Sequence, residues 1–387
     1  TRWRKVPTSD SLSELIGWAK DKKLAIVSDS SFSLARKNLK KLLAEKNVKW
    51  FEYEPIDMKK PEKDLASAFG LNHSIRSIPD FKRRQRVLSL DCDFLGNREA
   101  YNQANSRSFM AGRQIRPNKP EDAKTMNRLY SVESDLTITG GVADHRLRLE
   151  SSKFSSFTRV FLASILTKLK SEDKKLIAHL NKEKKQFSEH TKWISECATD
   201  ICNNSSSSLV LAGNHLPEDV HVAVFAINHA LGVTGKNIKY KSIEFDVSEP
   251  ILNLEKSILD QETDALLILG GNPVFHTQSF INWDEISSKL ENSARIGFSI
   301  DESSQICDLH IGQSHYLESW DIGLTWDNDS VVPVQPLISP LFDTVSDVDC
   351  LLNILEDPRD SFEFVQSIFD DEINTGANKS SFEDFLR

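Results

Sequence analysis

The chain has 387 residues, which is more than one hydrophobic core usually holds, so its length predicts at least two domains. Its apolar fraction of 39% and charged fraction of 27% are those of a folded globular protein, and they exclude collagen-like or largely disordered classes. The net charge of −9 argues against a general nucleic-acid binder, and no apolar run is long enough to span a bilayer.

The cysteines indicate neither a disulfide framework nor a metal cluster. The chain has five of them, an odd number, and no pair has Cys-x-x-Cys spacing. We therefore expect no zinc or iron–sulfur site in this chain. Cys197 and Cys202 lie five residues apart on a predicted helix and are interpreted as buried apolar thiols.

The first half of the chain alternates predicted strands and helices. Residues 23–29 form an apolar run that indicates a buried strand, and the serines after it offer caps for a helix. Further strands are predicted at 48–53, 87–91 and 128–133, and a helix at 62–69 ends at Gly70. Residues 153–202 are predicted to be mainly helical, because their aromatic and aliphatic side chains form two stripes at helical spacing.

The second half of the chain repeats this alternation. Its predicted strands lie at 209–213, 240–246, 265–269, 295–300 and 309–311, and its predicted helices at 217–231 and 283–290. An amphipathic helix is expected after residue 357. Strands that alternate with helices favour an α/β fold with a doubly wound, mainly parallel sheet.

One glycine turn is a candidate binding loop. Gly270, Gly271 and Asn272 follow the predicted strand 265–269. Ligands of open α/β sheets bind at the carboxyl ends of the strands, where glycines let backbone N–H groups approach a phosphate. The chain has no G-x-G-x-x-G pattern and no Walker lysine, so an ordinary strand-to-helix turn is the favoured interpretation.

Two other polar groups have both a functional and a structural interpretation. His310, His315 and Glu318 are metal-ligand types, but their spacing differs from the helical H-x3-H pattern and favours structural histidines. Asp91 and Asp93 stand at a strand end, where they can bind a ribose or cap a helix, and a cap is favoured. No G-x-S-x-G elbow supports a hydrolase triad, so we predict no catalytic residue.

Four segments of the sequence resemble the corresponding parts of one protein family. Three of them are residues 87–96, 126–147 and 211–236; the fourth joins 267–273 to 315–320 and 335–342. By these segments the chain resembles the molybdopterin oxidoreductase superfamily over most of its length, from about residue 11 to residue 355. Within the superfamily it looks most like the large iron–sulfur subunit of alternative complex III, a bacterial quinol-oxidising respiratory complex.

This resemblance implies two Rossmann-like, three-layer α/β domains with mainly parallel sheets, one inserted in the other. The discontinuous domain would comprise residues 11–80 and 206–355, and the inserted domain, with a helical end, residues 81–205. Residues 356–387 would form a C-terminal helical tail that leads to segments outside this chain, where the iron–sulfur clusters of the family are expected.

The chain departs from the superfamily in the segments that hold the cofactor. Glu133-Ser134-Asp135 replaces an Asp-Pro-Arg, so an arginine that would meet the anionic cofactor is missing and a repelling charge is added. Cys92-Asp93 replaces an Asn-Pro, and residues 150–152 replace a glycine-threonine-aspartate segment. We therefore expect no molybdopterin and no metal in this chain. If the ancestral cleft is still used, the expected cofactor-binding residues are Gly270, Gly271, Asn272, Asp91 and Glu133.

The resemblance implies a scaffold and docking role for a cofactor-free domain of a respiratory electron-transfer subunit, one that is not catalytic alone. Its expected partners are a multihaem cytochrome c and an integral membrane quinol-binding subunit. Its expected location is the periplasmic side of the bacterial inner membrane, as a peripheral protein. Two alternatives stay open: a molybdopterin-dependent oxidoreductase with degenerate motifs, and a nucleotide-binding module that uses Gly270, Gly271 and Asp91.

Overall fold

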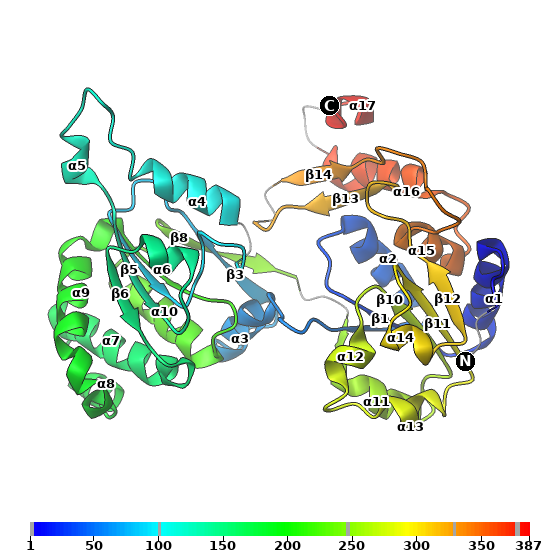
Figure 1. Cartoon of the computed structure of the whole chain (residues 1–387), viewed down its shortest axis with the longest axis horizontal. Helices are drawn as coiled ribbons and strands as arrows, with labels where there is room; N and C mark the ends of the chain where they lie inside the picture. The colour runs from blue at the N-terminus through cyan, green and yellow to red at the C-terminus, as the bar shows by residue number, and fades with distance from the viewer. Residues whose placement is uncertain (1–3, 100–101, 245–247, 328–329, 376–379) are drawn as a thin grey trace. The chain divides into compact units, whose positions relative to one another are not determined.

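The computed structural model describes residues 4–99, 102–244, 248–327, 330–375 and 380–387. The chain divides into two compact units (Figure 1). Unit 1 consists of Thr1–Pro55 and Asp246–Arg387, and unit 2 of Ile56–Phe245. Unit 2 is therefore one continuous segment that interrupts unit 1, which is the inserted arrangement expected from the sequence.

Unit 1 is built on a six-stranded sheet in the order β12-β11-β10-β1-β2-β9, in which all neighbouring strands are parallel. Its strands are β1 (Leu24–Ser28), β2 (Lys49–Glu52), β9 (Glu249–Pro250), β10 (Ala265–Leu269), β11 (Asn292–Gly297) and β12 (Leu309–Gly312). A separate antiparallel pair is formed by β13 (Asp321–Leu324) and β14 (Val331–Val334). The helices are α1 (Thr8–Asp21), α2 (Leu34–Glu45), α11 (Leu252–Leu259), α12 (Pro273–Thr277), α13 (Trp283–Ser287), α14 (Glu302–Gln305), α15 (Asp347–Leu355), α16 (Ser361–Ile368) and α17 (Phe382–Phe385).

Helices cover both faces of this sheet, which explains why its central strands are almost entirely apolar. Alternate residues of a strand point to opposite faces, and every residue of β1 and β10 is buried. Ile26 and Leu267 pack against apolar side chains of α1, α2, α15 and α16. Val27 and Ile268 pack on the other side against α11 and α13. Unit 1 is thus a three-layer α/β/α arrangement.

Unit 2 contains a four-stranded parallel sheet in the order β6-β5-β4-β7. Its strands are β4 (Arg86–Leu90), β5 (Arg128–Glu133), β6 (His145–Arg148) and β7 (Ser208–Ala212), and β3 (Ser74–Pro79) pairs antiparallel with β8 (Ile238–Ile243). The helices are α3 (Lys60–Ala68), α4 (Asn102–Ala111), α5 (Asp122–Thr125), α6 (Ile138–Val142), α7 (Phe154–Lys168), α8 (Lys174–Leu180), α9 (Thr191–Asn203) and α10 (Glu218–Ala230).

The helices of unit 2 also lie on both sides of its sheet. Leu88 and Val132 pack against apolar side chains of α7, α9 and α10, whereas Val87 and Leu129 face a smaller cluster that includes Phe109 of α4. The predicted α/β class with mainly parallel, Rossmann-like sheets is therefore confirmed in both units.

The unit boundaries lie at other positions than those expected from the sequence. The expected ranges 81–205 and 206–355 assign β7 and α10 to the discontinuous domain. In the structure β7 pairs with β4, from Arg86 opposite Ser208 to Leu90 opposite Ala212, so it belongs to unit 2. Residues 56–80 also belong to unit 2, because β3 in this segment pairs with β8.

Several local predictions also differ from the structure. The strand expected at 240–246 begins earlier, as β8, and residues 245–246 lie outside the described part of the chain. The strands β3, β13 and β14 were not predicted, since they are short and partly exposed and carry little apolar alternation. None of the helices within the described ranges combines the length and the apolar character that crossing a membrane requires.

Candidate functional site

Each parallel sheet has one point where the chain connections diverge, and such a point is the usual ligand position in an open α/β sheet. In unit 1 it lies between β1 and β10, because β1 leads to β2 on one side and β10 leads to β11 on the other. In unit 2 it lies between β4 and β7, because β5 and β6 lie on the opposite side of β4 from β7. We call these positions switch point 1 and switch point 2.

The structure places the predicted site residues at the carboxyl ends of the strands around these points. Gly270, Gly271 and Asn272 directly follow β10 at switch point 1. Asp91 directly follows β4 at switch point 2, and Glu133 is the last residue of the neighbouring β5. The five residues thus form two groups, one in each unit.

At switch point 1, the glycine turn is held by the chain itself. Gly270 and Gly271 have φ angles of 69° and 59°, a left-handed conformation that favours glycine. The N–H of Gly270 donates to the carbonyl of Ile296 at 3.1 Å. The buried Arg295 donates from Nη1 to the Gly270 carbonyl at 2.8 Å and from Nη2 to the Gly271 carbonyl. Arg295 also pairs with Asp301 at 2.9 Å.

Asn272 has a capping role at the end of this turn. Its side-chain oxygen accepts hydrogen bonds from the N–H of Phe275, at 3.4 Å, and from the hydroxyl of Ser303, at 2.7 Å. Its amide nitrogen donates to Glu302 at 2.7 Å. Both ends of the amide are therefore engaged within unit 1, as expected of an N-cap of α12.

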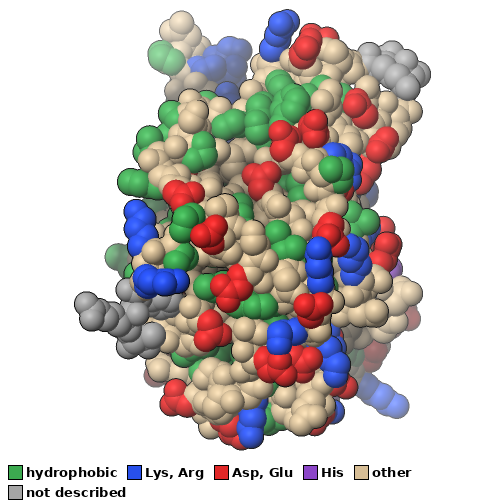
Figure 2. All heavy atoms as spheres, turned by 90° about the vertical axis from the view of Figure 1, so that its right-hand side faces the viewer, with side chains coloured by type: hydrophobic (Ala, Val, Ile, Leu, Met, Phe, Trp, Pro, Cys, Tyr) green, Lys and Arg blue, Asp and Glu red, His purple; other side chains and the backbone are tan. Residues whose placement is uncertain are grey.

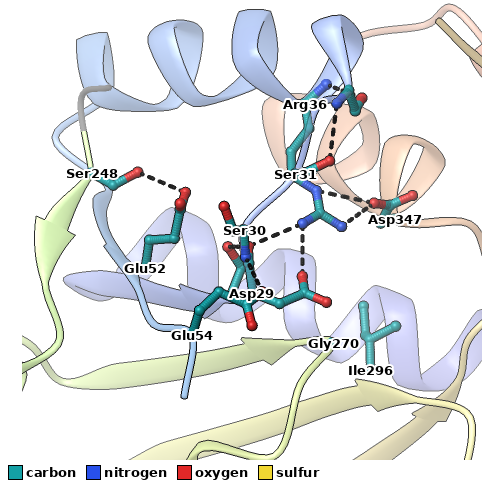
Figure 3. Close-up of polar contacts among 12 residues, drawn as sticks. Asp29, Ser30, Ser31, Arg36, Glu52, Glu54, Ser248, Gly270, Ile296 and Asp347 are labelled. Atoms are coloured by element: carbon teal, nitrogen blue, oxygen red, sulfur yellow. Dashed lines mark hydrogen bonds and ion pairs between the residues drawn. The ribbon is translucent and has the colours of Figure 1, made fainter. Parts of the chain in front are cut away.

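A carboxylate lies directly above the glycine turn. A Cβ atom added to Gly270 would lie 3.0 Å from Oδ2 of Asp29, the residue that follows β1. Figure 3 shows the buried Arg36 of α2 between Asp29 and Asp347, with N–O distances of 2.9 Å and 2.6 Å. Beside them, the N–H of Ser30 donates to Glu54 at 2.9 Å. Because two carboxylates share one guanidinium, the space where a phosphate would approach the turn faces a net negative charge.

Switch point 2 has a different chemistry, because it combines a buried carboxylate with an exposed imidazole. Asp91 is buried and accepts two hydrogen bonds from Ser134, from its N–H at 3.2 Å and from its hydroxyl at 2.9 Å. His215, which follows β7, places its Nε2 3.2 Å from Oδ2 of Asp91, and its side chain is 51% exposed. Asp91 has a φ of 46°, a conformation that few residues other than glycine adopt and that the surrounding contacts hold.

The pKa shifts at switch point 2 follow from these contacts. Burial acts to raise the pKa of Asp91, but the hydrogen bonds from His215 and Ser134 outweigh it and hold that pKa below its ordinary value. Asp91 is therefore a carboxylate that accepts only, so Nε2 of His215 carries the proton and donates. The same hydrogen bond raises the pKa of His215 above its ordinary value. Burial raises the pKa of the nearby Glu99 to about 7, although the N–H of Asn214 opposes this shift.

Two further carboxylates on this edge are engaged in hydrogen bonds or ion pairs within the chain. Asp93 is buried and accepts hydrogen bonds from the N–H and the hydroxyl of Thr139, at 3.0 Å and 2.8 Å. Glu133 is buried, pairs with Arg146 and accepts from the hydroxyl of Thr137 at 2.7 Å. Arg146, which lies beside Glu133, is thus bound to a carboxylate of the chain.

The remaining candidate residues serve local contacts. His310 lies 3.0 Å from the hydroxyl of Ser304, and Glu318 accepts from the N–H of His315 at 2.9 Å. In the part of the chain that the structure describes, no group of three or more His, Cys, Asp or Glu side chains is arranged to hold a metal ion. All five cysteines are free, and burial raises the pKa of the Cys92 thiol well above its ordinary value.

His215 and Glu99 belong to no motif that the sequence alone marks as a candidate site. His215 stands three residues after the end of β7, at the same edge as Asp91, and this position is the signal that would have found it. Glu99 lies in the loop after β4. The N–H of Asn214 donates to its carboxylate at 3.4 Å, and no local sequence pattern predicts this contact.

Comparison with known proteins supports the fold and goes no further. No family model matches the chain, and no curated protein sequence matches it. Among solved structures, acetylene hydratase from Pelobacter acetylenicus is similar with a TM-score of 0.66 and 12% identity, over 100% of this chain and 63% of that one. The chain thus spans less than two thirds of that protein's length.

A second similar structure is a formyltransferase/hydrolase complex from Methylorubrum extorquens, determined with methylofuran. Its TM-score is 0.53 at 11% identity, over 90% of this chain and 95% of that one. Together the two likenesses fit the molybdopterin oxidoreductase-like fold expected from the sequence, without pointing to alternative complex III in particular. At these identities they speak for the fold alone.

Proposed function

We propose that this chain is a cofactor-free, molybdopterin oxidoreductase-like domain that acts as a scaffold and docking surface in an electron-transfer complex. The complex would be a quinol oxidoreductase of the alternative complex III type. In it, iron–sulfur clusters and haems elsewhere in the assembly carry the electrons, and this domain holds the neighbouring subunits in place.

The observation that carries this proposal is the state of switch point 1. A pterin cofactor carries anionic phosphate groups, which bind best to free N–H groups and cations. Here the N–H of Gly270 is bonded to Ile296, and Arg295 is paired with Asp301. Asp29 lies beside the turn and shares Arg36 with Asp347, which leaves a net negative charge there. These residues do not fit an anionic cofactor.

The edge of unit 2 supports the same conclusion. Asp91, Asp93 and Glu133 are all buried carboxylates at the ends of β4 and β5. Two arginines near them are bound, since Arg146 pairs with Glu133 and Arg98 pairs with Asp135. An incoming phosphate would have to displace these pairs and then remain close to the carboxylates, which is unfavourable.

The partners and the location are part of the proposal. We expect contacts with a multihaem cytochrome c and an integral membrane quinol-binding subunit, on the periplasmic side of a bacterial inner membrane. Membership of a larger assembly is supported by the similar formyltransferase/hydrolase structure, which is described as a complex.

Metal and pterin analysis of the full-length protein, purified in its native complex, tests the proposal. Molybdenum and tungsten are measured by mass spectrometry, and pterin is measured by fluorescence after oxidative release. We expect both metals and pterin far below one equivalent, in a complex that contains haem and oxidises quinol. Stoichiometric molybdenum or tungsten together with pterin would overturn the proposal and favour the alternative, a molybdopterin-dependent oxidoreductase with degenerate motifs.

A further inference from the structure

An exposed apolar patch lies at the carboxyl edge of the unit 1 sheet and in the loop after β14. It consists of large side chains in three loops: Phe298, Tyr316, Leu337, Ile338, Leu341 and Phe342. Phe342 is 78% exposed and Leu337 is 75% exposed. We call these six residues the apolar patch. Single exposed apolar residues are common on protein surfaces, but a contiguous group of this kind marks an interaction site.

Ring contacts and hydrogen bonds make the patch contiguous. The ring of Phe298 lies 6.0 Å from that of His315, and His315 lies 4.2 Å from Tyr316. The N–H groups of Leu337 and Ile338 both donate to the carbonyl of Leu317, at 2.8 Å and 3.2 Å. The three loops that carry the apolar side chains therefore lie next to one another.

The loops are also fixed in place. Glu318 accepts from the N–H of His315 at 2.9 Å and from the N–H of Leu341 at 3.1 Å, so it ties two loops together. Beyond Phe342, Asp343 accepts from the N–H of Thr8 at 3.0 Å, which anchors the loop to α1. A surface held in this way loses little conformational entropy when it binds a partner.

The chain segment that carries the patch contains acidic groups and no Lys or Arg. Between Arg295 and Arg359 the sequence has no Lys or Arg, and its charged residues are Asp and Glu with two histidines. Glu318 and Asp343, which border the patch, form no ion pair with a Lys or Arg of the described residues. Figure 2 shows one face of the molecule, on which apolar side chains, carboxylates and Lys or Arg side chains are interspersed.

We infer that the apolar patch docks a protein partner whose contact surface has an apolar centre and a rim of Lys and Arg. This inference rests on the proposed scaffold function and locates it on the chain. A second copy of this chain would bring carboxylates against carboxylates, and an anionic membrane surface would be repelled in the same way. A basic rim matches these carboxylates, which form no ion pair with a Lys or Arg of the described residues, and accelerates association at low salt.

Cross-linking of the native complex tests the chemistry of the partner. A carbodiimide joins a carboxylate directly to a nearby lysine amine, with no spacer. We expect Glu318 or Asp343 to be joined to lysines of another polypeptide, and hydroxyl-radical labelling of Tyr316 and Phe342 to fall at least fivefold from the isolated chain to the complex. Cross-links only to a second copy of this chain, or unchanged labelling of both side chains, would overturn the inference.

A double variant tests the energetic role of the patch. Leu341→Ser with Phe342→Ser removes two exposed side chains, so the fold is expected to persist with an unchanged circular dichroism spectrum. We expect at least tenfold weaker association with the partner, because central apolar residues dominate binding at an interface. The matched control is Leu252→Ser, which changes an apolar residue of α11 that is 64% exposed and lies outside the patch. Equal association of the variant and the control would refute the docking role.

The outcomes separate this inference from the proposed function. An intact complex without molybdopterin, in which the patch stays fully labelled, contradicts the patch and leaves the scaffold role standing. A preparation with stoichiometric molybdopterin contradicts the scaffold role, whatever the labelling of the patch.

Discussion

The two switch points share a topology and differ in chemistry. At switch point 1 the glycine turn is closed by contacts within the chain. The buried Arg295 donates hydrogen bonds to its carbonyls, and Asp29 lies above Gly270. At switch point 2 the buried Asp91 holds His215, and half of the imidazole remains open to solvent. The polar groups of switch point 1 are thus bound within the chain, whereas switch point 2 exposes a titratable imidazole to solvent.

The difference shows that a parallel α/β sheet fixes where a site can lie and does not fix what it binds. Both edges have strand ends in the favoured position, and in both the side chains decide the outcome. A buried arginine with carbonyl and carboxylate partners stabilises a closed turn, while a carboxylate–histidine pair sets the proton position on an exposed ring. Four predictions test this contrast.

The largest expected effect is at switch point 1. Arg295→Met leaves the carbonyls of Gly270 and Gly271 and the carboxylate of Asp301 without their buried partner, so we expect a loss of about 3–5 kcal/mol in the free energy of unfolding. Urea unfolding followed by tryptophan fluorescence reports mainly on unit 1, since all tryptophans but Trp193 belong to that unit.

Arg98→Ala is the control for this prediction. Its ion pair with Asp135 has exposed side chains on both sides, so we expect a much smaller change in unfolding free energy than for Arg295→Met. Equal effects of the two variants would contradict the view that Arg295 seals switch point 1.

The second largest effect is expected at switch point 2, where Gly213 lies close to the backbone of Asp91. A Cβ added to Gly213 would lie 2.1 Å from the carbonyl oxygen of Asp91, so Gly213→Ala must displace the loop that carries His215. We expect a loss of about 1–3 kcal/mol and the loss of the raised histidine pKa. Chemical unfolding and NMR titration measure these effects, and Gly141→Ala, with nothing within 4 Å of its added Cβ, is the control expected to change neither.

The third effect is a pH dependence caused by Glu99. Its pKa is about 7 in the folded chain and near 4.5 when unfolded, so the folded state binds more protons between these values. The contribution of Glu99 to stability is complete below pH 4.5 and is lost as pH rises through 7. Glu99→Gln should therefore gain about 1–2 kcal/mol over the wild type at pH 8 and nothing comparable at pH 5. If the free energies of unfolding of Glu99→Gln and the wild type differ by the same amount at pH 8 and pH 5, the carboxyl group of Glu99 is not buried in solution.

The smallest effect is the pKa of His215 itself. Asp91→Asn removes the carboxylate that raises this pKa, so the NMR titration midpoint of the imidazole should fall. A histidine whose folded pKa is raised contributes stability below its unfolded pKa of about 6.5, and this contribution is lost as pH rises through the folded value. An unchanged midpoint would show that Asp91 does not hold the ring in solution.

Much of the fold followed from local patterns in the sequence. The apolar runs at 265–269 and 87–91 predicted buried strands because a strand covered on both faces must be apolar throughout, and β10 and β4 lie there. Asp91 and the Gly270–Gly271 turn were recognised as strand-end groups for the same reason. Their roles as cofactor ligands stay predictions.

Other features needed contacts between distant segments. The pairing of β7 with β4 joins residues more than a hundred positions apart, and nothing near Ser208 indicates which sheet it enters. The contact of Arg295 with the glycine turn and the contact of His215 with Asp91 likewise form only when the chain is folded.

The sequence by itself thus determined the class of fold, the alternation of strands and helices and the polar residues at the strand ends, because these depend on the period and chemistry of neighbouring residues. Only the tertiary structure decided the unit boundaries, the closure of one switch point and the exposed imidazole at the other. These depend on which charges meet across the sheet edges, and a charge is neutralised or left free by partners that the local sequence does not contain.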